Sequence, residues 1–280
     1  MIFKKLLRGV SSSVRGLLFL LKNGGSTYAK ISLIEYGGIL EGKTILVTGG
    51  SSGIGLSIAK KALSEKANVI VTGRSIKKLE ELKLTINCER FKTMQWDVSN
   101  IQDIETNLQE AIKLFGNIDI IINNAGVLLE QKFPFVSESS WDDTYKVNSK
   151  AVFFLCQSMS KIWIEKKSKG KIINVSSTSG FYGTVIPYGM TKWDIVGLTE
   201  GLAKRLIKEG IVVNGIAPGR TATDMLGRES EGNIYDQNTL PKRFALPEEI
   251  SELALFLMSD ASNFIVGQTI ICDGGYSLEL

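Results

Sequence analysis

The feature that most constrains the fold is a regular alternation, from Lys43 onward, between short β-branched runs and longer amphipathic stretches. The short runs have the composition of strands, and the longer stretches carry apolar residues at helical spacing. Strands joined by helices form a parallel sheet that helices cover on both faces, so we predict an α/β fold. The predicted strands span residues 44–48, 68–72, 91–96, 118–123, 171–175, 212–216 and 269–272. The predicted helices include residues 54–66, 101–115, 141–164, 188–208 and 248–258.

The chain of 280 residues is predicted to form a single domain over residues 41–280, preceded by a helical extension over residues 1–40. Residues 1–22 have a leucine-rich stripe, and all six charged residues before position 35 are basic. This pattern predicts a basic amphipathic helix with two alternative roles. It either adsorbs to an anionic membrane surface or packs on the protein's own assembly. Gly9 and Gly16 weaken an isolated helix and favour packing.

Composition excludes several kinds of site. The sequence contains no histidine, which excludes a Ser-His-Asp hydrolase and a His-ligated zinc enzyme. The three cysteines have no paired spacing, so we expect no metal site and a reducing, cytoplasmic location. Beyond residue 34 the chain has 27 basic and 29 acidic residues, which argues against a nucleic-acid surface.

A glycine-rich turn lies between the first predicted strand and the first predicted helix. Glycines in this context let backbone N–H groups approach a pyrophosphate at the helix N-terminus, although a simple tight turn is the alternative. We expect this turn to hold the phosphates of a dinucleotide. The expected contacts are Gly49, Ser51, Ser52, Gly53, Ile54 and Gly55.

The residues after the second and third strands bear on the choice of cofactor. An acid usually ends the second strand of NAD-binding folds, where it holds the ribose 2′-hydroxyl group. This chain has Gly73 there, followed by Arg74, whose cation suits a 2′-phosphate; a solvated arginine is the alternative. We therefore predict that NADP(H) is preferred over NAD(H). Asp97 and Val98 are expected to contact the adenine. For Asp97 the alternative is that it caps the next helix.

An ordered set of motifs resembles the classical short-chain dehydrogenase/reductase family. The resemblance covers about residues 41–280. The motifs are TGGSSGIG at 48–55, NNAG at 123–126, Asn148, SS at 176–177, YGMTK at 188–192, PGRTAT at 218–223 and DGG at 273–275.

This resemblance implies a Rossmann-type doubly wound sheet of about seven strands, assembled as a homotetramer or dimer. It implies hydride transfer between NADP(H) and a carbonyl or secondary alcohol. The catalytic roles carry over to Asn148, Ser177, Tyr188 and Lys192. Further cofactor contacts carry over to Asn124, Ala125, Gly126, Pro218, Gly219, Thr221 and Thr223, with Tyr188 and Lys192 also touching the cofactor.

The chemistry of these residues is consistent with that implication. Tyr188 and Lys192 are four residues apart in a helical pattern, so both lie on one face. A lysine ammonium group near the phenol favours the phenolate, and we expect it to lower the pKa of Tyr188. Tyr188 would donate the proton, Ser177 would orient the carbonyl oxygen, and Asn148 would hold a water for reprotonation.

The sequence leaves the substrate open. Residues 224–246 are expected to form a lid over the substrate. A 3-oxoacyl-carrier-protein reductase is one alternative, although Ser168 and Glu209 stand where its docking arginines would fall. A cofactor-binding regulator or scaffold without turnover is another. The expected lining residues of the pocket are Phe181, Tyr182, Val185, Met225 and Leu226.

Overall fold

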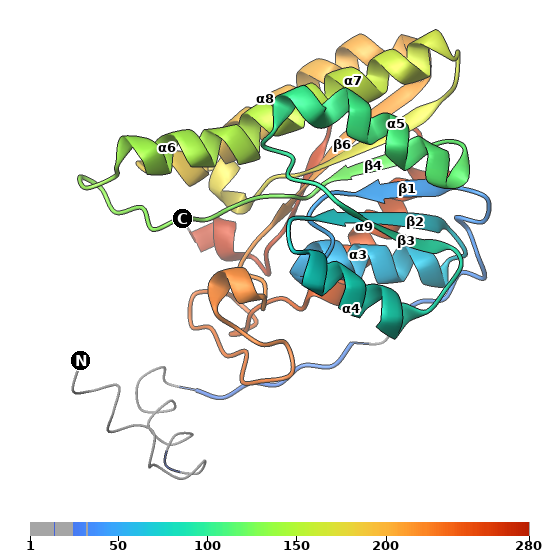
Figure 1. The fold of residues 1–280 in the computed structure, drawn as a ribbon. Coiled ribbons are helices and arrows are strands. Elements are labelled where there is room, and N and C mark those ends of the chain that lie inside the picture. The colour runs from blue at the N-terminus through green and yellow to red at the C-terminus, as the bar shows by residue number, and fades with distance from the viewer. Residues whose placement is uncertain (1–13, 15–24, 32, 280) are drawn as a thin grey trace.

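A computed structural model describes residues 14, 25–31 and 33–279, and confirms the α/β prediction. Seven parallel strands form one sheet in the order β3-β2-β1-β4-β5-β6-β7 (Figure 1). All seven lie within two residues of their predicted bounds. The strands are β1 (Thr44–Val47), β2 (Asn68–Gly73), β3 (Phe91–Gln95), β4 (Ile120–Asn123), β5 (Gly170–Val175), β6 (Ile211–Pro218) and β7 (Thr269–Cys272).

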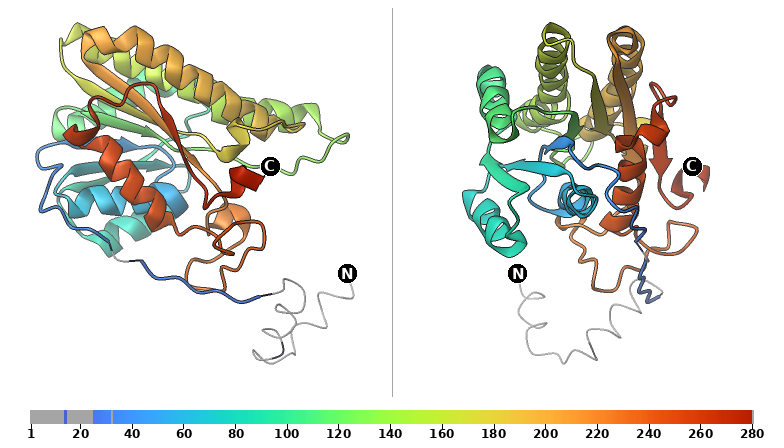
Figure 2. Two further views of the ribbon diagram at one scale, coloured as in Figure 1. Left: turned by 180° about the vertical axis from the view of Figure 1, so that it is seen from behind. Right: turned by 90° about the vertical axis from the view of Figure 1, so that its right-hand side faces the viewer.

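Helices cover both faces of the sheet (Figure 2). One layer contains α3 (Gly53–Ser64), α4 (Ile76–Ile86) and α9 (Pro247–Met258). The other contains α5 (Ile104–Phe115), α7 (Ala151–Glu165) and α8 (Pro187–Leu206), and α6 (Glu138–Tyr145) precedes α7.

Neighbouring residues of each strand point to opposite faces, so a strand covered on both sides must be apolar throughout. In β1, Ile45 and Val47 pack against the α3 layer, whereas Leu46 between them packs against the α7 layer. The continuous apolar runs in the sequence are the consequence of this double burial.

One predicted helix, at residues 141–164, is interrupted. A π-helical turn at Lys146–Lys150 separates α6 from α7 and contains Asn148. A π-turn places one extra residue in the helix and shifts the side chains that follow, and such turns are frequent at functional sites.

The order of the strands indicates where the ligand-binding crevice of the fold lies. The chain builds outward from β1 to β3, then returns to β4 on the other side of β1 and builds outward to β7. In doubly wound sheets, ligands bind beyond the carboxyl ends of the strands at this reversal. The turns after β1 and β4 therefore meet at the expected ligand site.

Residues 25–31 and 33–38, which we name the strap, run in extended conformation along the α3 layer (Figures 1 and 2). The Thr27 N–H donates to Oδ1 of Asn233 over 2.9 Å, and Ile234 donates from its N–H to the Thr27 carbonyl. Farther along, Nζ of Lys61 donates to the Ile34 carbonyl. Ala29 and Ile31 pack against a small apolar cluster built around residues 222–246.

The strap ends on a single carboxylate. Glu65 accepts hydrogen bonds from the backbone N–H groups of Tyr36 and Gly38, each over 2.9 Å. Partial burial opposes ionisation of Glu65, but these hydrogen bonds outweigh it and lower its pKa. The amphipathic helix predicted for residues 1–22 lies outside the described residues, apart from Val14. None of the described helices is long and apolar enough to cross a bilayer.

Candidate active site

The glycine-rich turn after β1 is shaped by close packing against the turn after β4. Gly49 has a positive φ of 63°, and a Cβ atom there would lie 2.8 Å from Cα of Ala125. Asn124 ties the two turns together, because its Nδ2 donates to the Thr48 and Gly49 carbonyls, each over 3.0 Å. The turn is thus held open at the N-terminus of α3.

That N-terminus is suited to an anion. Ser52 occupies the N-cap position of α3, yet its side chain accepts no capping hydrogen bond. The first N–H groups of a helix carry partial positive charge and attract phosphate. Ser51, Ser52, Gly53 and Ile54 line the adjoining cavity, as does Gly49, whereas Gly55 supports the turn by packing against Asn124.

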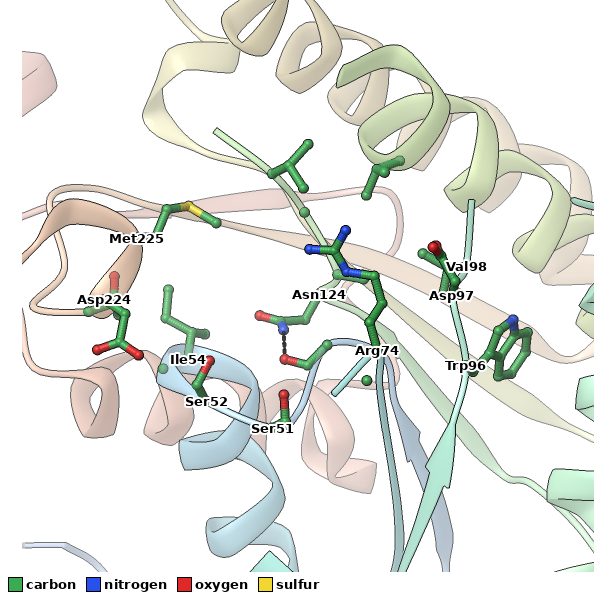
Figure 3. Close-up of a pocket in the computed structure, with 18 residues that line it drawn as sticks. Ser51, Ser52, Ile54, Arg74, Trp96, Asp97, Val98, Asn124, Asp224 and Met225 are labelled. Carbon is green, nitrogen blue, oxygen red and sulfur yellow. Dashed lines mark hydrogen bonds between the residues drawn. The ribbon is translucent and has the colours of Figure 1, made fainter. Parts of the chain in front are cut away.

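This cavity of about 250 Å³, which we name the cofactor half, contains most of the predicted cofactor residues (Figure 3). Arg74 extends from the end of β2 toward the space between α3 and Asp97. Val98, Asn124, Ala125, Gly126 and Thr223 line the same cavity. Asp97 does not cap a helix; its Oδ1 accepts from the Ser99 N–H over 3.0 Å and closes a local turn.

Close packing restricts position 73, which usually carries an acid in NAD-binding folds, to a small residue. A Cβ atom on Gly73 would lie 3.0 Å from Oγ of Ser51, tighter than ordinary contact. A larger side chain at position 73 would press on the phosphate turn. The first polar side chain after β2 is therefore one residue later, at the exposed Arg74.

Tyr188 and Lys192 lie together on the first turns of α8, as their spacing predicts. Nζ of Lys192 is 5.5 Å from the centre of the Tyr188 ring and donates to the Val175 carbonyl over 3.0 Å. Burial lowers the pKa of Lys192 to about 8. Lys192 is therefore held at the carboxyl end of β5, beside the phenol.

The expected lowering of the Tyr188 pKa is wrong for this structure. Burial raises the pKa of Tyr188, and a hydrogen bond with Ser177 opposes that rise only in part. Desolvation of the phenol is the largest influence on its pKa, and the neighbouring ammonium group of Lys192 does not reverse it. The phenol of Tyr188 is therefore protonated at neutral pH.

The three serines after β5, Ser176, Ser177 and Ser179, have different hydrogen-bond partners. Oγ of Ser177 accepts from the Ser179 N–H over 3.2 Å and interacts with Tyr188. Ser176 is buried, and its Oγ donates to the Lys192 carbonyl over 2.8 Å. Oγ of Ser179 pairs with the Tyr182 hydroxyl over 3.0 Å. Of the three, Ser177 is the one paired with the phenol.

Asn148 is buried and fixed by the chain beyond β4. Its Oδ1 accepts from the Val127 N–H over 2.8 Å, and its Nδ2 donates to the Val127 carbonyl over 2.9 Å. A Cβ atom on Gly126 would lie 3.4 Å from Oδ1 of Asn148 and 3.9 Å from Nζ of Lys192. Because that atom is absent, the side chains of Asn148 and Lys192 both lie close to the open side of Gly126.

A second cavity of about 280 Å³ adjoins the first, and we name it the substrate half. It shares Ile54, Asn124, Gly126, Thr223 and Met225 with the cofactor half. Ser177, Tyr188, Lys192, Pro218, Gly219 and Thr221 also line it. Three of the four residues predicted to be catalytic, Ser177, Tyr188 and Lys192, thus line the substrate half, and Asn148 lies next to Gly126, which lines both halves.

The lining of the substrate half differs in part from the sequence expectation. Tyr182, Met225 and Leu226 line it, but Phe181 and Val185 do not and are exposed. Sequence reasoning missed Leu128, Arg220 and Tyr276, which arrive from three separate parts of the chain. Arg220 stands inside the PGRTAT motif, so its position after β6 was a signal that could have found it.

The comparisons with known proteins agree with this geometry. Residues 43–233 match the family model for short chain dehydrogenases. The protein is a short-chain dehydrogenase. It is accordingly an NAD(P)-dependent oxidoreductase that transfers hydride between the nicotinamide and a carbonyl or alcohol group.

Similar proteins act on several kinds of substrate. The chain is 34% identical over 243 residues to the 3-oxoacyl-[acyl-carrier-protein] reductase of Aquifex aeolicus, covering 84% of this chain and 98% of that one. It is 34% identical over 249 residues to the gluconate 5-dehydrogenase of Gluconobacter oxydans, covering 86% and 97%. A gluconate 5-dehydrogenase from Burkholderia cenocepacia, solved with NADP and tartrate, matches with a TM-score of 0.79 at 28% identity, covering 87% and 99%. This short-chain dehydrogenase therefore shares its catalytic domain with enzymes of different specificity.

Proposed function

We propose that this enzyme is an NADPH-preferring carbonyl reductase in which Tyr188 donates the proton. The observation that carries the proposal is that Ser177, Tyr188 and Lys192 line one cavity, directly beside a cleft with the features of a dinucleotide site. The catalytic domain is assigned to residues 41–280, with residues 1–40 as its extension.

The residues of the cofactor half fit a 2′-phosphorylated dinucleotide. The uncapped N-terminus of α3 would hold the pyrophosphate, and Arg74 would pair with the 2′-phosphate. Gly73 leaves no acid at the position that would repel this phosphate. The solved relative with NADP and an actinorhodin polyketide ketoreductase solved with NADPH support the same preference.

The nicotinamide supplies the hydride when it is bound. Oη of Tyr188 donates a proton to the substrate oxygen, and its raised pKa keeps the phenol protonated at neutral pH. Oγ of Ser177 donates a hydrogen bond to the same oxygen and orients it. Lys192, which is held by the Val175 carbonyl, would hold the ribose and, through a water on Asn148, would restore the proton of Tyr188.

The test is NADPH oxidation against a panel of ketones, aldehydes and ketoses, together with a direct measurement of NADPH binding. Turnover that Tyr188→Phe abolishes while binding persists supports the proposal. Tight binding without turnover of any carbonyl would instead favour a regulator or scaffold.

A 3-oxoacyl-carrier-protein reductase is the second candidate, because the Aquifex relative has that activity. Docking of an acidic carrier protein requires basic residues on the surface of the reductase. The exposed Glu209 opposes such a partner, although Lys166, Lys167 and Lys169 surround Ser168, the other docking position, in the sequence. A 3-oxoacyl thioester in the panel separates this candidate from a reductase of free ketones.

We also propose a homotetramer or dimer. Apolar side chains of the α7–α8 layer are exposed in the single chain, among them Phe153, Ile164 and Trp193. Light scattering of the purified protein tests the oligomeric state. For residues 1–22 the membrane and packing roles both stand as proposals, and binding to anionic vesicles at low salt distinguishes them.

A further inference from the structure

The substrate half has an unusual balance of charge. Among the described residues that line it, Lys192 and Arg220 are the charged ones, and no carboxylate lines it. Lys192 is buried and committed to the Val175 carbonyl and to the phenol. Arg220 is thus the cation available to a substrate, and its side chain is 42% exposed.

Arg220 is held rigidly by its other contacts. Its Nε donates to Oδ2 of Asp236 over 2.5 Å, and the Asp236 side chain is 3% exposed. Its guanidinium carbon lies 5.0 Å from the centre of the buried Phe244 ring. Asp236 is fixed in turn, because its Oδ1 accepts from the backbone N–H and the side-chain amide of Asn238.

These contacts use only one edge of the guanidinium group. In the described part of the chain, the two terminal nitrogens of Arg220 have no hydrogen-bond partner. Arg243 is different, because both of its terminal nitrogens pair with Glu249, each over 2.7 Å. A planar guanidinium held along one edge presents its remaining N–H groups in the geometry that binds a carboxylate.

We propose that Arg220 binds a carboxylate of the substrate, which makes oxo acids and hydroxy acids the substrate class of this enzyme. The inference rests on the proposed function, because it concerns the cavity that contains Ser177 and Tyr188. A carboxylate entering this cavity meets a preorganised guanidinium group, and Asp236, the carboxylate already paired with that group, is 3% exposed and does not line the cavity. An uncharged ketone gains nothing from Arg220.

The test uses substrates that differ only in the charged group. 5-Keto-D-gluconate is compared with L-sorbose, which carries a hydroxymethyl group in place of the carboxylate. 4-Oxopentanoate is compared with its methyl ester. Hydrogen bonds to charged groups predict a 10- to 100-fold higher kcat/KM for each acid, expressed mainly in KM.

Variants locate the source of this preference. Arg220→Gln is expected to bring the acid-to-neutral ratio close to one. Because that change leaves Asp236 buried without its partner, the double variant Arg220→Gln/Asp236→Asn is measured as well and should give the same ratio. Arg228→Gln is the matched control, because Arg228 also faces the Phe244 ring but lines a different cavity. It should keep the wild-type ratio.

A binding measurement keeps this inference separate from the proposed function. Gluconate and sorbitol are titrated into the NADP-loaded protein. Acid-selective binding that Arg220→Gln removes supports the carboxylate site even if no carbonyl is turned over, in which case the proposed reductase fails alone. Equal binding of acid and neutral compound, or selectivity that survives Arg220→Gln, overturns the inference. If D-fructose 6-phosphate binds more tightly than the carboxylates, the site prefers a phosphate and the proposal of a carboxylate site is overturned.

Discussion

The cofactor half and the substrate half of the cleft are held together by different kinds of contact. In the cofactor half, the turns after β1 and β4 bond directly to each other, as when Asn124 donates to the Thr48 and Gly49 carbonyls. The lid expected at residues 224–246, which contributes Met225 and Leu226 to the wall of the substrate half, depends on side chains such as Asp236 and Asn233. Asn233 joins this lid to Thr27, 206 residues earlier.

The difference separates a geometry that the fold imposes from contacts that are particular to this chain. Parallel strands of one sheet bring the cofactor turns together whatever the rest of the chain does. The lid has its own small apolar cluster, and the strap packs on it from outside residues 43–233 that match the family. Specificity is therefore expected to depend on contacts of the lid, and cofactor binding on the turns.

The largest effect is expected where the two halves meet. Tyr188→Phe removes the proton donor and should lower kcat by about 100-fold or more, because general acid catalysis contributes at least that factor. NADPH affinity, measured by fluorescence, and the melting temperature should change little. A variant that retained more than about a tenth of the wild-type rate would contradict the role of Tyr188.

Lys192 gives the stability a dependence on pH. Its pKa of about 8 in the folded protein lies below the ordinary 10.5. Between these values the unfolded chain binds a proton that the folded chain lacks, so stability rises with pH across this window. The rise should be about 3 kcal/mol in the free energy of unfolding.

Urea unfolding at several pH values between 7.5 and 10 measures this rise. Lys192→Met should lack it and should gain most over the wild type below pH 8, where the burial of the charge costs the wild type in full. Parallel curves for the two proteins would show that Lys192 is not the group responsible. Measurements stop at pH 10 because the pKa of Tyr188 is raised in the folded protein, so above pH 10 its titration lowers the stability as the pH rises.

Arg74 tests the cofactor half alone. Arg74→Ala should weaken NADPH binding by roughly 10- to 100-fold, the range of a charge-assisted hydrogen bond, and leave NADH binding nearly unchanged. The measurement is the ratio of the two dissociation constants. Equal losses for both cofactors would mean that Arg74 is only a solvated residue at the start of α4. The KM for the carbonyl should stay the same if the two halves are independent.

The smallest effect is expected at the contact between strap and lid. Asn233→Ala removes the acceptor for the N–H groups of Thr27 and Tyr235, so the lid should lose about 1 kcal/mol of support. The KM for the carbonyl should rise about fivefold with NADPH affinity unchanged. Asn263→Ala, an exposed asparagine far along the chain, is the control. An equal loss of NADPH affinity in Asn233→Ala would show that the halves are coupled.

The sequence by itself determined the sheet and the cofactor half. Buried parallel strands need continuous apolar runs, so their bounds could be read to within two residues. The turn at 48–55 and the pair Tyr188–Lys192 are local in the chain, and local spacing is enough to place them on one turn or one helix face. The roles given to these residues remain proposals for the experiments above.

Only the tertiary structure decided the rest. The π-helical turn at Lys146–Lys150 has no sequence signature and became visible only as the interruption of a predicted helix. The pKa of Tyr188 depends on how deeply the phenol is buried, which spacing does not report. Arg220 meets Asp236 and Phe244, and the strap meets Asn233, through contacts between distant segments. Such contacts follow from packing in three dimensions, and local patterns in the sequence carry no information about them.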